Sequence, residues 1–158
     1  MRDFEYRGKN QCDDKWHYGY LVYVPADNSY KITQGKEISY FVQSTTIGQY
    51  TGFKDKNGTK MFENDIVKFN KQIFEIVYEK GAFGLASIEI IDYSTLEKDV
   101  EKETNNSYLG CYNDNFISLF EIAWNFNDCV DNCFDRIEVI GNMNDNPELF
   151  LRQSECTT

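Results

Sequence analysis

The segment DIVKFNKQIFEIVYEKGAFGLASIEII, residues 65–91, constrains the fold of this 158-residue chain more than any other. Over residues 66–70, Ile66, Lys68 and Asn70 lie opposite the apolar Val67 and Phe69, which is the period of a β-strand with two different faces. The apolar run over residues 73–77 mixes both faces, as a buried strand does. Lys80-Gly81 then supplies a turn. The segment therefore predicts consecutive strands.

Further strands are predicted on both sides of this segment. WHYGYLVYV (Trp16–Val24) is rich in aromatic and β-branched residues and ends at a turn cluster that begins with Pro25. YKIT (30–33) follows closely enough to pair back as a hairpin, and ISYFV (Ile38–Val42) and RIEVIG (136–141) add two more strands. Because aromatic residues make up 16% of the chain and favour strands, the predicted fold class is mainly β.

Helix signals are fewer. Ser94 and Glu97 form a capping-box pattern, which predicts a short surface helix over about residues 95–103. Pro147 follows an asparagine and is typical of a first helical position, so a second short helix is predicted there. FISLFEIAWNF (116–126) fits both periods, and we interpret it as a strand because its neighbours are strands and it has many rings.

The segment GQYTGFKDKNGTKMFENDIV (48–67) has the composition of a ligand loop. Counted from its first aspartate, however, the sixth position is Lys60 where a calcium loop needs glycine, and the twelfth is Ile66 where it needs glutamate. The glycines also lack the spacing of a phosphate loop, and a strand follows them instead of a helix. Asn57-Gly58 instead predicts a hairpin with a type I′ turn.

No residue stands out as catalytic, and no cofactor site is predicted. Cys129 and Cys133 lie four apart, but a zinc site needs two more ligands, and the chain has one histidine, His17, and no second close cysteine pair. We therefore interpret the two cysteines as reduced thiols, with metal binding as the alternative. An acid–base pair of carboxylates stays open, because acidic residues are plentiful.

The chain is acidic, with a net charge of −10 and a pI near 4.5. Nucleic-acid binders neutralise phosphates with basic residues, so this charge argues against such a role. It fits solubility, a basic protein partner, or mimicry of a polyanion. The chain has no apolar run of membrane-spanning length, and residues 1–10 lack the apolar core of a signal peptide, so we expect a soluble protein of the cytosol.

Three segments together resemble one family. YRGK (6–9) with WHYGYLV (16–22), the block TIGQYTGFKDKNGTKMFENDIV (46–67), and IEVIGNMNDNPELF (137–150) occur in the order and spacing of the YopX family of phage and prophage proteins. One departure is Asn64, where the family usually has glycine. Asparagine also tolerates the left-handed backbone region, so the departure affects only the local turn.

The resemblance implies a mainly β fold of small, SH3-like or partly open barrel-type sheets with one or two short helices. It is compatible with a single domain over residues 1–158, or with two β subdomains, about 1–50 and 51–158, that share a core. It also implies an accessory protein in the cytoplasm of a bacterial host that carries the phage. It supplies no catalytic residues.

From these features we expect a non-enzymatic protein that binds a host or phage protein and forms homo-oligomers. Trp16, Tyr18, Tyr20 and Tyr50 are the candidate interface residues, although such rings serve equally well in a core. The first alternative is a small barrel that binds nucleic acid through exposed aromatic residues beside a basic cluster. The second is an enzyme that uses a thiol or a carboxylate pair.

Overall fold

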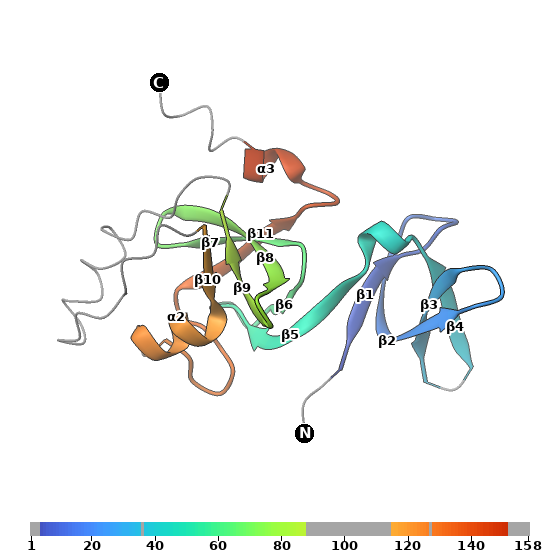
Figure 1. Ribbon diagram of the computed structural model, residues 1–158, viewed down its shortest axis with the longest axis horizontal. Coiled ribbons are helices and arrows are strands. Elements are labelled where there is room, and N and C mark those ends of the chain that lie inside the picture. The colour runs from blue at the N-terminus through green and yellow to red at the C-terminus, as the bar shows by residue number, and fades with distance from the viewer. Residues whose placement is uncertain (1–3, 36, 88–114, 127, 152–158) are drawn as a thin grey trace. The chain divides into compact units, whose positions relative to one another are not determined.

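The protein is mainly β. The computed structural model describes residues 4–35, 37–87, 115–126 and 128–151, which form two antiparallel sheets and two short α-helices (Figure 1). The chain divides into two compact units, Met1–Gly52 (unit 1) and Phe53–Thr158 (unit 2). The expectation of one domain, or of two halves with a common core, stays a prediction.

The first sheet has six strands in the order β4-β3-β2-β1-β5-β6, and the second has five in the order β10-β9-β8-β7-β11. The strands of the first sheet are β1 (Tyr6–Lys9), β2 (Trp16–Val24), β3 (Ser29–Gln34), β4 (Ile38–Val42), β5 (Gly48–Lys54) and β6 (Lys60–Phe62). Those of the second are β7 (Asp65–Phe69), β8 (Gln72–Glu79), β9 (Ala82–Ala86), β10 (Phe116–Ser118) and β11 (Ile137–Asn142). The helices are η1 (Ser44–Thr46), α2 (Leu119–Asn125) and α3 (Pro147–Leu151).

In unit 1, four strands curl around a small apolar centre. The end of β1 meets the end of β4 through an isolated bridge between Asn10 and Val42, and the N–H of Gln43 donates to the carbonyl of Lys9 at 2.8 Å. Ile32 and Val42 are buried on the side toward which the strands curl. Over the described residues, neither sheet closes into a complete barrel.

In unit 2, β7, β8 and β9 form the consecutive strands that the sequence predicts. Two-residue turns join them, at Asn70-Lys71 and at Lys80-Gly81, and all four of these residues have positive φ. Positive φ at both central positions defines a type I′ turn, whose twist matches that of the strands beside it. The predicted turn at Lys80-Gly81 is therefore confirmed.

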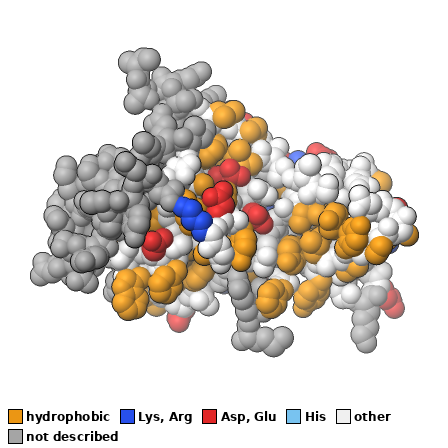
Figure 2. Space-filling model, in the orientation of Figure 1, with side chains coloured by type: hydrophobic (Ala, Val, Ile, Leu, Met, Phe, Trp, Pro, Cys, Tyr) orange, Lys and Arg blue, Asp and Glu red, His pale blue; other side chains and the backbone are white. Residues whose placement is uncertain are grey.

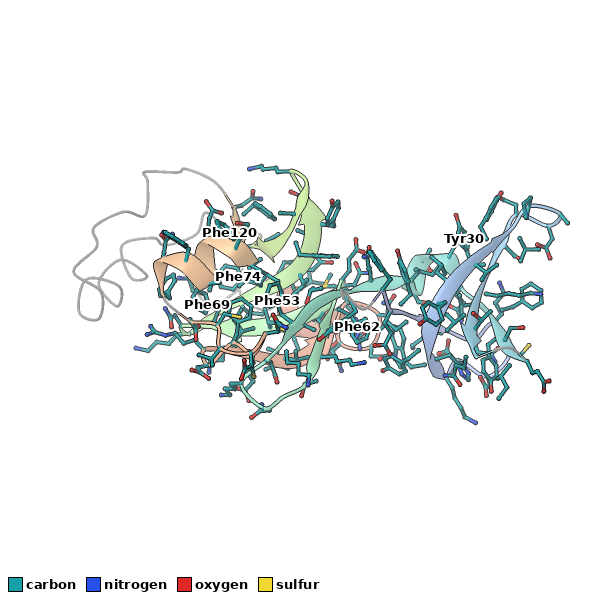
Figure 3. All side chains as sticks on the ribbon, turned by 90° about the horizontal axis from the view of Figure 1, so that it is seen from below. Tyr30, Phe53, Phe62, Phe69, Phe74 and Phe120 are labelled. Atoms are coloured by element: carbon teal, nitrogen blue, oxygen red, sulfur yellow. The ribbon has the colours of Figure 1, made fainter. Side chains whose placement is uncertain are left out.

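The core of unit 2 is built from aromatic rings and branched aliphatic side chains. The Phe69 ring meets the Phe126 ring edge-on with centroids 5.3 Å apart, and the Phe53 and Phe134 rings lie 5.2 Å apart. Figure 3 shows Phe53, Phe69 and Phe74 among the side chains of unit 2. Burying one such ring contributes about 2 kcal/mol. The fully buried side chains of this core are Met61, Val67, Phe69, Phe74, Ile76, Leu85, Phe134 and Ile137, together with Ile122 of α2.

The interpretation of residues 116–126 as a strand is wrong for most of its length. Residues 116–118 form β10, but the chain then turns into α2. Ser118 starts the helix, because its hydroxyl accepts from the Glu121 N–H at 3.2 Å while a Glu121 carboxylate oxygen accepts from the Ser118 N–H at 2.9 Å. This reciprocal pair is a capping box, and it decides between the two periods that the sequence allows.

The type I′ turn predicted at Asn57-Gly58 is also wrong, although the hairpin itself is present. Of the two residues, only Gly58 has positive φ. Its N–H donates to the carbonyl of Asp55 at 2.9 Å, and the Asp55 N–H donates to the carbonyl of Thr59 at 2.8 Å. These bonds close a three-residue loop, in which the last residue is the left-handed one.

Three predicted elements agree with the structure. The strands β2 and β4 have the predicted bounds, and α3 begins at Pro147. Asn64 has a φ of 66°, so it does adopt the left-handed conformation that glycine would provide. The helix predicted over about residues 95–103 lies outside the described residues.

Asp55 ties the loop after β5 to the rest of unit 2. Its side chain is fully buried, and one carboxylate oxygen accepts from the N–H groups of Asn57 and Thr59 at 2.9 and 2.8 Å. The other oxygen accepts from the N–H of Val139, 84 residues away, at 3.0 Å. The Cys133 thiol donates to the Asp55 carbonyl at 2.9 Å. The residue is therefore a structural acceptor and has no free oxygen for catalysis.

Replacing Asp55 by alanine is expected to lower the free energy of unfolding by about 3 to 5 kcal/mol, because three backbone N–H groups lose a charged acceptor. Urea unfolding at pH 7, followed by circular dichroism, measures this loss. Glu79→Ala, at an exposed position of β8, is the control and should change stability by less than about 0.5 kcal/mol. An Asp55→Ala loss no larger than the control's would contradict this role.

Candidate interaction surface

The predicted interface residues of β2 lie on one side of the strand. Side chains alternate along a strand, so Tyr18, Tyr20 and Val22 point to the same face. All three are exposed, Tyr20 to 65% and Tyr18 to 42%. The aromatic pattern read from the sequence therefore places exposed rings together on one face of unit 1.

Neighbouring strands extend this face. Val22 pairs with Lys31 of β3, which pairs with Phe41 of β4, and residues opposite each other in an antiparallel pair share a face. The Lys31 ammonium lies 4.1 Å from the centre of the exposed Phe41 ring, in agreement with this register. The next row along the strands is formed by Tyr20, Thr33 and Ser39. We call the surface formed by Tyr18, Tyr20, Val22, Lys31, Thr33, Ser39 and Phe41 the β2 face.

Figure 2 shows hydrophobic side chains gathered over the strands of unit 1. The opposite side of the same sheet is well buried, since Ile32 and Val42 are almost completely inaccessible. The exposure is therefore confined to one side of the sheet. Sequence reasoning missed Phe41 and Val22. The alternation in ISYFV could have indicated Phe41, had it been combined with the register of β3 and β4.

Gly19 allows β2 to change partners between Tyr18 and Tyr20. Residues 16–19 pair with β1, and residues 20–24 pair with β3. A Cβ atom at Gly19 would lie 2.2 Å from the carbonyl oxygen of Thr33. The close approach of the two backbones therefore requires glycine.

The other two predicted interface residues are placed differently. The Trp16 ring is half-buried, with the Arg7 guanidinium 4.8 Å and the Lys9 ammonium 5.6 Å from its centre. Lys9 also forms an ion pair with Asp14 at 3.3 Å. Trp16 thus packs at the end of the β2 face. Tyr50 is only 6% exposed and does not contribute to it, so of the two roles that the sequence left open for this ring the structure shows the buried one.

Two shallow grooves adjoin the β2 face in unit 1. The larger, of about 460 Å³, is lined by residues of the β2–β3 loop, of β3 and of β4, among them Asn28, Tyr30 and Phe41. The smaller, of about 250 Å³, lies between Phe4 and Tyr20. The described residues that line them include no histidine or cysteine, and each groove has one carboxylate, Asp27 in the larger and Glu5 in the smaller.

The predicted thiols lie in a hairpin of unit 2. Val130 and Cys133 pair across a turn at Asp131-Asn132, whose two residues both have positive φ, so the cysteines do not share a helical face. Burial, and then the charge of the neighbouring Asp128, raise the pKa of the Cys129 thiol, which makes it a weaker nucleophile at neutral pH. Within the described ranges, no three His, Cys, Asp or Glu side chains gather in a group that could hold a metal ion.

Asp128 is the most perturbed carboxyl group in the described part of unit 2. Burial raises its pKa from the ordinary 3.8 to about 6, and the charge of Asp135 adds to the effect. One oxygen accepts from the Asp135 N–H at 2.9 Å, while the other is buried, 4.0 Å from Arg136 Nε. The carboxyl thereby closes the loop that leads to Asp135.

A protein-family model matches most of the chain. The family model of the YopX protein matches residues 5–151, which include both units. The chain belongs to the YopX family. No curated protein matches the chain.

Two solved structures resemble the whole chain. The crystal structure of YopX from Bacillus subtilis has 15% sequence identity and a TM-score of 0.48, and the match covers 94% of this chain and 98% of that one. The crystal structure of protein EF1440 from Enterococcus faecalis has 19% identity and a TM-score of 0.49, with 95% and 99% covered.

Within this YopX-family chain, charge is divided unequally. Residues 1–52 contain six basic and six acidic side chains, so unit 1 is neutral. Residues 53–158 contain ten basic and twenty acidic side chains and carry the entire net charge of −10. The β2 face therefore belongs to the neutral unit. Over the described residues, no helix has the length and apolar character needed to cross a bilayer.

Replacing Gly19 by alanine is expected to destabilise the protein by about 2 kcal/mol or more, because the new methyl group overlaps the Thr33 carbonyl. Thermal unfolding, monitored by Trp16 fluorescence in a Trp124→Phe background, measures the effect on unit 1. Gly35→Ala is the matched control, since Gly35 has a φ of 71° but no atom within 4 Å of the added Cβ, and it should cost about 1 kcal/mol. A loss at Gly19 no larger than that at Gly35 would refute the crowding.

Asp128→Asn is expected to stabilise unit 2 at pH 7.5 by about 1 to 2 kcal/mol and to leave its stability nearly unchanged at pH 4. Because the folded-state pKa is raised, the stabilisation from Asp128 is present below pH 3.8 and is lost as the pH rises through about 6. Urea unfolding of both proteins between pH 4 and pH 8 tests the sign. A wild-type protein that gains stability over this window relative to Asp128→Asn would overturn the assignment.

Proposed function

We propose that the protein is a non-enzymatic interaction module, whose binding surface is the β2 face of unit 1. The observation that carries the proposal is the exposure of Tyr18, Tyr20, Val22 and Phe41 on one continuous face of three paired strands. Contiguous exposed apolar surface is uncommon on a monomeric protein and is typical of a binding site. Tyrosine suits such a site, because its ring is apolar and its hydroxyl can remain hydrogen-bonded.

The β2 face is also preorganised for binding. Its strands are joined by backbone ladders, and the opposite side of the sheet is anchored by buried Ile32 and Val42. Little conformational entropy would therefore be lost from this surface when a partner binds. Because unit 1 is neutral, neither an acidic nor a basic partner would meet long-range repulsion from this unit.

Nucleic-acid binding has less support. It needs basic side chains that are available for phosphates next to the exposed rings. Among the described basic residues of unit 1, Arg7 is buried beside Trp16, Lys9 pairs with Asp14, and Lys15 pairs with Asp13 at 3.3 Å. Lys31 lies on the β2 face itself, with its ammonium 4.1 Å from the centre of the Phe41 ring, so the face has one described basic side chain and no basic cluster. An enzyme has less support still, because neither groove brings catalytic side chains together.

Membership of the YopX family supports a biological role for this surface. We infer an accessory protein of a phage or prophage, acting in the cytoplasm of the bacterial host on a host or phage protein or on a second copy of itself. We also infer that β1 to β4 form the partly open, SH3-like barrel implied by the family resemblance. The bridge between Asn10 and Val42 supports this inference, since it joins the first and fourth of these strands.

The proposal predicts that Tyr18→Ser with Tyr20→Ser weakens binding at least about ten-fold, as expected for the loss of two interface tyrosines. Tyr23→Ser is the matched control, because Tyr23 is exposed on the opposite face of the same strand. Light scattering after size exclusion gives the oligomeric state of the three proteins. Affinity capture from nuclease-treated lysate of a phage-carrying bacterium gives the partners and their relative retention.

Loss of self-association or of a captured protein in the double variant alone would support the β2 face. The proposal fails if the double variant keeps the wild-type oligomeric state and every captured protein. It also fails if Tyr23→Ser loses as much binding as the double variant. Binding that disappears on nuclease treatment would favour the nucleic-acid alternative.

A further inference from the structure

A second exposed apolar surface lies on α2 in unit 2. Phe120 and Trp124 are four residues apart and are 70% and 76% exposed, and their rings are stacked with centroids 6.3 Å apart. Together they expose roughly 300 Å² of ring surface, comparable to the largest apolar patch of a typical monomer. We call Phe120 and Trp124 the α2 aromatic pair.

The other side of the same helix is apolar as well. Leu119 and Ile122 are buried in the core of unit 2, where Phe126 packs against Phe69. A surface helix needs only one apolar face to pack against a core, and its other face is normally polar. A helix that is apolar on both faces is normally buried on both. The α2 aromatic pair is therefore not explained by the packing of unit 2.

The pair is held on a rigid base. The capping box at Ser118 and Glu121 sets the start of the helix, and the buried Leu119 and Ile122 hold its rotation. The stacked arrangement of the Phe120 and Trp124 rings further limits their rotamers. A ligand would meet two preorganised rings, which reduces the entropic cost of binding.

The charge around the pair restricts what can bind there. Unit 2 carries the whole net charge of −10. Figure 2 shows acidic side chains beside the hydrophobic group over α2. Glu121 on the helix is exposed, although one of its carboxylate oxygens also accepts from Ser118, and Asp131 and Asp135 in the following hairpin are exposed as well. Arg136 of that hairpin has its guanidinium 5.5 Å from the centre of the Phe126 ring and its Nε 4.0 Å from Asp128.

This charge excludes three kinds of partner on electrostatic grounds. Nucleic acid, an anionic membrane surface and a second copy of unit 2 would all bring negative charge to a negative surface. A cationic segment would instead interact favourably with both the aromatic rings and the carboxylates. Arginine and lysine bind over the faces of aromatic rings, tryptophan best of all, and they pair with carboxylates at the rim.

We propose that the α2 aromatic pair binds a cationic segment of a partner protein, with arginine side chains stacked on Trp124 and Phe120 and paired with the surrounding carboxylates. This site differs from the β2 face in position and in the chemistry of its ligand. It does not rest on the proposed function of unit 1.

The test uses the full-length protein and three labelled twelve-residue peptides, of the repeating sequences Arg-Leu-Ala, Gln-Leu-Ala and Glu-Leu-Ala. Fluorescence anisotropy at low salt is expected to show saturable binding of the arginine peptide only, with an affinity that falls as NaCl is added. Trp124→Ser should weaken this binding about ten-fold, and Trp124→Phe should restore part of it, because any aromatic face attracts a cation.

Leu151→Ser in α3, another exposed apolar position of unit 2, is the control and should bind the peptide like the wild type. Tyr20→Ser should also leave the binding unchanged, which separates this site from the β2 face. Circular dichroism and thermal unfolding verify that each variant folds, as expected for replacements at exposed positions.

Four results would overturn the proposal. The arginine peptide fails to bind at low salt, or it binds Trp124→Ser as tightly as the wild type, which would leave only non-specific charge attraction. The glutamine peptide binds as tightly as the arginine peptide, which would leave only apolar contact. The protein forms a dimer that Trp124→Ser dissociates, which would make a second copy the occupant.

Discussion

Unit 2 depends on one buried carboxylate. Asp55 accepts from the N–H groups of two residues in its own loop and from Val139 in β11, and its carbonyl accepts from the thiol of Cys133. Segments about 80 residues apart in the chain are thereby joined at a single side chain. A charged acceptor with three donors is stable in the interior only when all three are present, so the contact forms cooperatively with the fold.

The structure presents two surfaces of opposite character. The β2 face is neutral and rich in tyrosine, and its rings stand on a sheet whose other side holds Ile32. The α2 aromatic pair is small and belongs to the acidic unit, on a helix whose other side holds Ile122. In both places the exposed rings sit directly opposite buried side chains. This arrangement holds the rings in position and leaves their outer faces available.

How much could be predicted depended on whether local signals agreed. For β2, β4 and the hairpins of β7 to β9, periodicity, composition and turn residues all favoured strands, and the strands are present. Residues 116–126 fitted two periods, and the capping box at Ser118 decided for a helix that strand-rich neighbours had argued against. The Asn57-Gly58 dipeptide indicated a hairpin correctly, but the Asp55 carboxylate organises a longer loop than the dipeptide alone would form.

The sequence by itself determined the family and the mainly β class, because alternation and motif order are local properties of the chain. It left open whether the rings of Tyr18 and Tyr20 are exposed or belong to the core. Only the tertiary structure decided that Tyr50 is buried, that Phe41 joins the β2 face, and that Phe120 and Trp124 remain exposed. A side chain's exposure depends on which strands pair and which helix face meets the core. Those contacts join residues far apart in the sequence, so no local pattern contains them.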